Sequence, residues 1–279
     1  MSEYANDVLV EPEWLERHLD DASIRIVEVD ETPALYREAH IPGAIGFDWR
    51  VDLQDQVRRA FLAPEAFGRL FGGRGIANDH LVILYGDRNN WFAAYTYWYL
   101  KYYGHDNVKL LNGPRERWIG EGRPTTAELP DHPPTTFVAQ PGDAAIRATR
   151  DEVLGALDRP DVLVDVRAPQ EYSGELIAMP GYENEGAQRS GHIPGAKSIP
   201  WAQAVNEDGT FKSADELREL YRGKGVLSGD PIISYCRIGE RSAHTWFVLH
   251  ELLGEQDVRN YDGSWTEWGN LMNVPIERG

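Results

Sequence analysis

The sequence has almost no cysteine, since only Cys236 is found among its 279 residues. One cysteine excludes an intramolecular disulfide, so the composition gives no sign of an oxidising compartment. Basic residues are also few, with 28 Lys and Arg against 45 Asp and Glu and a formal net charge of −17. A surface with this charge repels polyanions, and we therefore expect no nucleic-acid partner and no anionic membrane.

Long apolar segments and targeting signals are lacking as well. The stretch over residues 91–100, among the most apolar in the chain, is too short and too polar to cross a bilayer. Residues 1–11 contain neither the basic start nor the apolar core of a signal peptide. With 42% hydrophobic residues the chain can still bury a substantial core. We therefore expect a cytoplasmic enzyme.

What the chain does contain is an internal repeat. The segment His-Ile-Pro-Gly-Ala occupies residues 40–44 and again residues 192–196. Residues 82–85 and 108–113 likewise resemble the segments that lie 150 residues further on. A repeat of this length indicates a duplicated domain rather than a solenoid unit.

The join between the two copies predicts the domain boundaries. Residues 125–143 hold four prolines and little apolar periodicity, which is typical of a linker. We therefore expect an N-terminal domain over 1–124 and a C-terminal domain over 144–279, with an insertion near 174–190. In both halves short β-branched runs alternate with helical patterns, which predicts α/β domains with parallel sheets.

The most informative segment surrounds Cys236. An apolar strand pattern over 232–235 is followed by a six-residue loop that ends at Arg241 and by a helical pattern that begins near Ser242. Unpaired N–H groups at such a helix start favour thiolate and can lower a cysteine pKa from about 8.5 to roughly 3.5–7.5. Arg237 and Arg241 add cations suited to oxyanions. A lone cysteine is often a buried small hydrophobe, but this context favours a nucleophile.

The loop sequence Cys-Arg-Ile-Gly-Glu-Arg-Ser at 236–242, the repeated segments and the tandem organisation resemble the rhodaneses, or thiosulfate sulfurtransferases, of the actinobacterial type. The resemblance covers essentially the whole chain. It implies two tandem rhodanese-like domains, each a parallel five-stranded sheet flanked by helices, with a catalytic C-terminal copy. The first copy has Gly86 where the second has Cys236, so we expect the first to be inactive.

The resemblance also implies a chemistry. The Cys236 thiolate would take the outer sulfur of thiosulfate, release sulfite and hold a persulfide until cyanide or a thiol removes the sulfur. The substrate would be bound by the loop residues Arg237, Ile238, Gly239, Glu240 and Arg241. The expected partners are therefore a small-molecule sulfur donor and acceptor, with no metal and no cofactor.

Two cations found in animal enzymes of this family are replaced here by Ile238 and Glu171. Arg189, in the predicted insertion, is our candidate for a compensating substrate contact, and a solvated loop residue is the alternative.

Three further residues are expected to support the site. Asp165 and Arg167 follow the pattern of an internal ion pair behind the loop. His192 lies in the second copy of the repeated segment, and the first copy belongs to the half without a cysteine. A structural hydrogen-bonding role therefore suits His192 better than a catalytic one.

Three alternative functions are weighed against thiosulfate sulfur transfer. A 3-mercaptopyruvate sulfurtransferase has the same fold, but Arg237 favours a sulfonate-like donor. A phosphatase with a cysteine loop needs a longer loop than the four residues that separate Cys236 from Arg241. A non-catalytic partner-binding module is supported only by the missing cysteine of the first copy.

Overall fold

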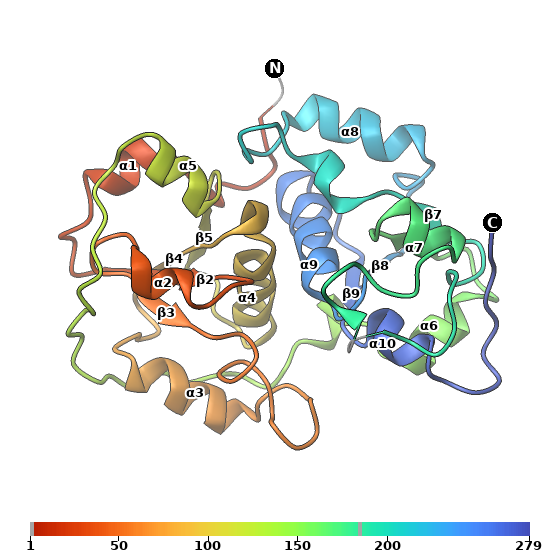
Figure 1. Ribbon diagram of the computed structural model, residues 1–279, viewed down its shortest axis with the longest axis horizontal. Helices are drawn as coiled ribbons and strands as arrows, with labels where there is room; N and C mark the ends of the chain where they lie inside the picture. The colour runs from red at the N-terminus through yellow and green to blue at the C-terminus, as the bar shows by residue number, and fades with distance from the viewer. Residues whose placement is uncertain (1–2, 184–185) are drawn as a thin grey trace. The chain divides into compact units, whose positions relative to one another are not determined.

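The computed structural model describes residues 3–183 and 186–279. The chain folds into two compact units, both visible in Figure 1. The first unit comprises Asp7–Asp143 with Val205–Phe211. The second comprises Ala144–Ala204 and Lys212–Gly279, with the start of the chain up to Asn6.

The first unit is built on a parallel sheet. Its strands are β1 (Leu9–Val10), β2 (Ile24–Val29), β3 (Ile45–Phe47), β4 (Leu81–Tyr85) and β5 (Val108–Leu111). Its helices are α1 (Pro12–Glu16), α2 (Leu35–Glu38), α3 (Pro64–Gly73), η1 (Arg88–Asn90), α4 (Trp91–Tyr102) and α5 (Arg115–Gly120). The strand order is β1-β5-β4-β2-β3. The apolar run at 91–100 belongs to α4, which contacts β2, β4 and β5 and is buried along that whole run.

The second unit also contains a parallel sheet. Its strands are β6 (Val162–Asp165), β7 (Lys197–Ser198), β8 (Ile232–Tyr235) and β9 (Val258–Tyr261). Its helices are η2 (Ala144–Ile146), α6 (Arg150–Ala156), α7 (Pro169–Ser173), η4 (Trp201–Ala204), α8 (Ala214–Gly223), α9 (Glu240–Trp246), η5 (Phe247–Leu252) and α10 (Ser264–Trp268). The strand order is β7-β6-β8-β9, and α9 packs against β8 and β9 (Figure 1).

This second sheet has one strand fewer, within the described residues, than the five that we predicted. The place that β1 takes in the first unit is occupied here by residues just after η2. They form a single parallel bridge, between Arg147 and Asn260, and Ala148 N–H donates to the Asn260 carbonyl at 3.0 Å. One bridge aligns the backbone without extending it into a strand.

The duplication predicted from the sequence is present in the strand order, because β3-β2-β4-β5 corresponds to β7-β6-β8-β9. The repeated segments make matching contacts. In the first unit the Ile41 N–H donates to the Tyr85 hydroxyl at 2.9 Å, and in the second the Ile193 N–H donates to the Tyr235 hydroxyl at 3.0 Å. Each repeated segment is therefore anchored to the end of the strand that precedes the loop.

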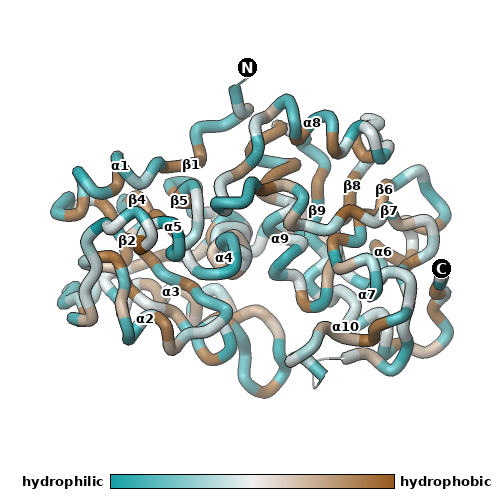
Figure 2. The backbone as a smooth tube through the Cα atoms, turned by 45° about the horizontal axis from the view of Figure 1, so that its top comes forward, coloured by the Kyte–Doolittle hydropathy of each residue, from teal (hydrophilic) through white to brown (hydrophobic). Residues whose placement is uncertain are grey.

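The core of each unit lies between its sheet and its helices. The strands β6 and β8 are buried along their whole length, as their near-continuous apolar sequences predict. In Figure 2 the hydrophobic colour is concentrated along strands such as β2 and β8. In the part of the chain that the structure describes, every helix is too short or too polar to cross a membrane.

Candidate active site

Cys236 begins the turn between β8 and α9. The strand ends at Tyr235, and the helix begins at Glu240, two residues before the predicted start. Gly239 has a φ of +99°, and a Cβ at this position would lie 2.8 Å from the Cα of Asp262. Only glycine avoids both the left-handed strain and this close approach. The curl of the loop therefore depends on Gly239.

The curled loop directs backbone N–H groups inward. The Gly239 N–H donates to the Sγ of Cys236 at 3.1 Å. The Cys236 N–H donates to the Oγ of Ser264, 3.0 Å away. The cysteine side chain itself is fully buried. The geometry provides an N–H donor for a sulfur anion, as a loop at a helix start is expected to do.

The Glu240 carboxylate also lies inside the loop and is fully buried. Its Oε2 accepts the Ile238 N–H and the Cys236 thiol, both at 3.2 Å. Its Oε1 lies 3.2 Å from Nη2 of Arg237 and 3.6 Å from Nε of Arg241. We predicted Glu240 as a substrate contact, and the structure places its carboxylate against the Cys236 thiol.

These contacts determine where the proton resides. Burial raises the pKa of the Cys236 thiol, and the charge of Glu240 raises this pKa further, against a lowering effect of Arg241. Burial also raises the pKa of the Glu240 carboxyl, but Arg237 and Arg241 outweigh it and leave this pKa below its usual value. Burial first, and the charge of the inward Glu240 side chain second, therefore favour the protonated thiol over the thiolate that a helix start alone predicts.

Arg241 connects α9 to α7. Its Nη1 donates to Oε2 of Glu171 at 3.0 Å, and both side chains are buried. The same Nη1 lies 3.3 Å from the Sδ of Met179. From the sequence, Glu171 was notable only because it replaces a cation found in animal enzymes of this family. The structure shows that it is the partner that holds Arg241. In this arrangement Arg241 braces the loop, and its contact with substrate stays a prediction.

Arg237 is covered by the predicted insertion. Its guanidinium carbon lies 4.0 Å from the ring centre of Tyr182, within the range of a cation–π contact. The side chain is 3% exposed. Sequence reasoning missed Tyr182 and Met179, because the insertion has no counterpart in the first copy that could have signalled its position.

The sequence matches the Rhodanese-like domain family twice, over residues 11–121 and 149–271. The chain belongs to this rhodanese family. Both matches agree with the tandem organisation and the two parallel sheets, so each half of the chain is a rhodanese-like domain.

Curated relatives match the full chain. A protein of Haloferax volcanii, whose name assigns it provisionally to the thiosulfate sulfurtransferases, is 56% identical over 100% of this chain and 99% of its own. The "Sulfur carrier protein TtuD" of Thermus thermophilus is 54% identical over 98% of this chain and 97% of its own. Both names concern the handling of sulfur.

A solved structure is similar over almost the whole rhodanese chain. It is a variant of EanB in complex with ergothioneine covalently linked with a persulfide cysteine. The TM-score is 0.83 at 25% identity, and the match covers 98% of this chain and 70% of the EanB chain. EanB is therefore a protein of this fold in which a cysteine carries a persulfide.

Behind the rhodanese loop, Asp165 and Arg167 form the ion pair that we expected. Nη2 of Arg167 lies 2.6 Å from Oδ2 of Asp165, and both side chains are buried. The same Nη2 donates to the Gly191 carbonyl at 2.7 Å. Next along the chain, the ring of His192 stacks on Tyr172 with its Nδ1 2.8 Å from the Tyr172 carbonyl oxygen. These residues fix the turn that precedes β7.

Arg189 contacts the backbone at the end of α10 and after it. Its guanidinium donates to the carbonyls of Trp268, Gly269, Leu271 and Val274 at 2.5–3.4 Å. These bonds cap the end of α10 and hold the segment that follows it. In this conformation the Arg189 guanidinium is held by backbone carbonyls. Its predicted substrate contact stays a prediction.

The loop of the first rhodanese domain has a different construction. A Cβ on Gly86 would lie 2.1 Å from the Val29 carbonyl oxygen, so a cysteine cannot take this place unless the backbone moves. Three consecutive residues, Arg88, Asn89 and Asn90, have φ values of 50°, 56° and 63°. The Asn90 side chain holds this strained turn by accepting the Gly86 N–H at 2.8 Å.

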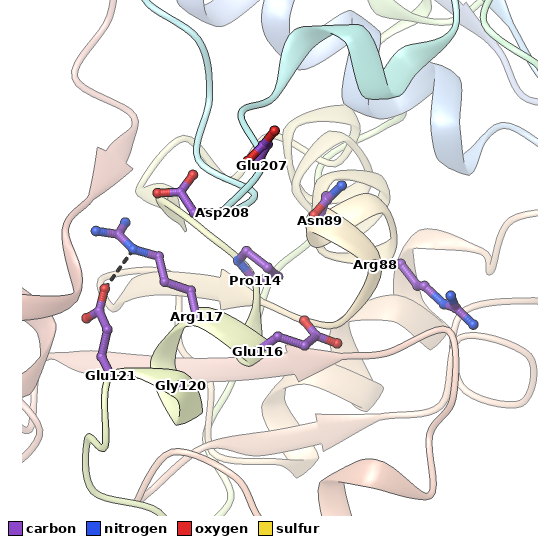
Figure 3. Close-up of a pocket in the computed structure, with 9 residues that line it drawn as sticks. All are labelled: Arg88, Asn89, Pro114, Glu116, Arg117, Gly120, Glu121, Glu207 and Asp208. Atoms are coloured by element: carbon purple, nitrogen blue, oxygen red, sulfur yellow. Dashed lines mark hydrogen bonds and ion pairs between the residues drawn. The ribbon is translucent and has the colours of Figure 1, made fainter.

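A pocket of about 520 Å³ lies beside this loop within the first unit (Figure 3). It is lined by Arg88, Asn89, Pro114, Glu116, Arg117, Gly120, Glu121, Glu207 and Asp208. Figure 3 shows Arg117 turned toward Glu121, to which it is paired at 2.9 Å. The lining contains no thiol. Although four carboxylates line this pocket, no group of His, Cys, Asp or Glu within the described residues is arranged to hold a metal.

Proposed function

We propose that this chain is a thiosulfate sulfurtransferase that moves sulfane sulfur to cyanide or a thiol through a persulfide on Cys236. One observation carries the proposal. The only cysteine of the chain lies at the start of a helix, with the Gly239 N–H 3.1 Å from its sulfur and two arginines in the same loop. Such a loop suits a nucleophile that alternates between thiolate and persulfide anion.

The reaction has two half-steps. The Cys236 thiol, which is buried in the closed loop, first becomes exposed and loses its proton to water, and the thiolate attacks the outer sulfur of thiosulfate. A new S–S bond forms at Cys236 as the S–S bond of thiosulfate breaks, and sulfite leaves with the bonding pair. Cyanide, or a thiolate, then attacks the outer persulfide sulfur and regenerates the Cys236 thiolate. The products are thiocyanate or a persulfide of the acceptor.

The loop residues have distinct proposed roles. The Gly239 and Ile238 N–H groups stabilise the outer sulfur anion of the persulfide. Arg237 binds the sulfonate oxygens of the donor, once it leaves its contacts with Glu240 and Tyr182. Arg241 holds the loop against α7 through Glu171.

The first domain, over residues 1–124, is proposed to be non-catalytic. Gly86 stands at the position that corresponds to Cys236, and the close approach of the Val29 carbonyl oxygen leaves no room there for a side chain. The proposed linker, 125–143, joins it to the catalytic domain, 144–279.

A protein thiol is a further acceptor that the relatives suggest. The name of the Thermus thermophilus relative describes a sulfur carrier, and a persulfide that is passed to another protein uses the same second half-step. A free thiol on Cys236 fits a reducing compartment, and we place the reaction in the cytoplasm.

The direct test of this function is thiocyanate formation from thiosulfate and cyanide. We expect turnover by the wild-type chain and none by Cys236→Ser, because the hydroxyl cannot carry sulfur. Parallel assays with 3-mercaptopyruvate and an aryl phosphate complete the comparison. A much faster reaction with mercaptopyruvate would replace the proposed donor, and cysteine-dependent phosphate release would contradict sulfur transfer altogether.

A further inference from the structure

The position of the Glu240 carboxylate is not explained by the proposed chemistry. Its two oxygens contact the Cys236 thiol, the Ile238 N–H and Nη2 of Arg237, each at 3.2 Å. The side chain is fully buried, so these contacts replace water entirely. A carboxylate held by backbone N–H and guanidinium groups has the same bonding pattern as a bound sulfonate.

Glu240 therefore occupies groups that an anionic donor needs. Thiosulfate would place its oxygens on Arg237, and the resulting persulfide would require the Ile238 N–H. Both are already bonded to Glu240. The charges in the loop also cancel, because Arg237 is paired with Glu240 and Arg241 with Glu171. A buried site of zero net charge attracts a dianion only weakly.

We propose that Glu240 is an internal anion that keeps the sulfur-free loop closed, holding the proton on Cys236 and competing with the anionic donor for Arg237 and the Ile238 N–H. The inference rests on the proposed function in taking Cys236 as the nucleophile. Glu240 contacts the reacting sulfur itself and so governs both the reactivity of Cys236 and the charge of the donors that reach it.

The same contact could instead belong to a general base that removes the thiol proton. The surroundings of Glu240 oppose that role. Arg237 and Arg241 keep the pKa of the carboxyl below its usual value in spite of burial, while burial and Glu240 raise the pKa of the thiol. Transfer of the proton from sulfur to Glu240 is therefore uphill.

The charged groups around the cysteine come from four elements. They are Arg237, Glu240 and Arg241 of the loop and α9, Glu171 of α7, and Asp262 after β9, and Asp262 is paired with Arg147.

The two roles predict opposite effects of removing the charge. In Glu240→Gln we expect the thiol pKa to fall by about one to three units, which is the usual effect of one adjacent charge. Alkylation of Cys236 should then become faster, and more so for an anionic reagent. We expect the ratio of the iodoacetate rate to the iodoacetamide rate to rise about tenfold over wild type, and the KM for thiosulfate to fall.

Because Cys236 is the only cysteine, alkylation reports on this site alone. Glu219→Gln is the matched control, since Glu219 is exposed on α8 and its removal changes the net charge equally. It should leave the ratio unchanged. Glu240→Ala should raise the ratio as Glu240→Gln does, and Glu240→Asp, which keeps the charge, should stay near wild type.

Slower alkylation by both reagents in Glu240→Gln or Glu240→Ala would overturn the inference in favour of a base. An unchanged ratio in these variants, or an equal rise in Glu240→Asp, would show that charge is not the cause. The alkylation needs no sulfur donor. Failure of the wild-type chain to form a persulfide would therefore reject the proposed function without changing this readout.

Discussion

Gly239 supplies the sulfur of Cys236 with a backbone N–H donor at 3.1 Å, in addition to the Ser242 hydroxyl at 3.5 Å. A left-handed backbone at residue 239 turns its own N–H toward Sγ, and the absent Cβ leaves room for Asp262. The glycine in this motif can be predicted from the sequence, because tight loops at helix starts need one. The inward direction of the Glu240 side chain cannot be predicted from the sequence, because acidic residues at helix starts also lie on the surface.

Gly239→Ala tests this dependence. The added methyl must tolerate a left-handed φ and a 2.8 Å approach to the Cα of Asp262, so the loop has to open. We expect a loss of stability of at least about 1 kcal/mol and a loss of most sulfur-transfer activity. Gly225→Ala is the control, because Gly225 has a φ of +70° with no atom within 4 Å of the added Cβ. Equal activity in the two variants would contradict the proposed role of the loop geometry.

Among the elements of the second unit, α7 and α9 are joined by the buried pair of Glu171 and Arg241. Glu171 makes a second hydrogen bond, because its Oε2 also accepts the Ala168 N–H at the start of α7. The strand–loop–helix order around Cys236 was predictable from apolar periodicity. The pairing of Glu171 with Arg241 was not predictable, because 70 residues separate the two partners and no local pattern links them.

Glu171→Gln should therefore be strongly destabilising. The substitution leaves the Arg241 charge buried without its main counter-charge, which typically costs about 3–5 kcal/mol. Chemical denaturation followed by tryptophan fluorescence would measure it. Asp151→Asn, which removes the partner of Arg150 in an exposed pair, should cost much less, because exposed ion pairs contribute little to stability. A similar cost for the two substitutions would show that the buried pair does not stabilise the loop.

His244, within α9, makes the element sensitive to acid. Burial lowers its pKa to about 3, while in the unfolded chain it titrates near 6.5. Below pH 6.5 the unfolded chain binds a proton that the folded chain does not. Stability should therefore fall as the pH drops, by about 1.4 kcal/mol per unit until the folded pKa is reached. In His244→Gln the fall in denaturation midpoint between pH 6.5 and pH 4 should be shallower. A fall as steep as in wild type would exclude this contribution.

In the molecule as a whole, the two copies of the domain share their frame and differ at the position of Cys236, where the first copy has Gly86. The repeated segments, the tyrosine anchors and the strand order agree in both copies. The duplication itself follows from sequence similarity at spacings of 150 and 152 residues. The shorter sheet of the second unit could not be predicted from the sequence, because a single bridge at Arg147 depends on backbone details that apolar patterns do not encode.

The loop of the first copy differs in space as well as in sequence. The carbonyl oxygen of Val29 fills the volume in which a side chain on Gly86 would lie. The proposed sulfur-carrying thiol therefore has one position in the chain, because the backbone leaves no room for a side chain at residue 86. A cysteine introduced at residue 86 is expected not to replace Cys236.

The central claim is that Cys236 carries the transferred sulfur, and intact mass analysis after incubation with thiosulfate tests it most directly. The wild-type chain should gain the mass of one sulfur atom and lose it again when cyanide is added. Cys236→Ser should gain nothing, and neither should the double variant Gly86→Cys with Cys236→Ser. A wild-type chain that gains no sulfur, or a Cys236→Ser chain that still gains one, would contradict the account.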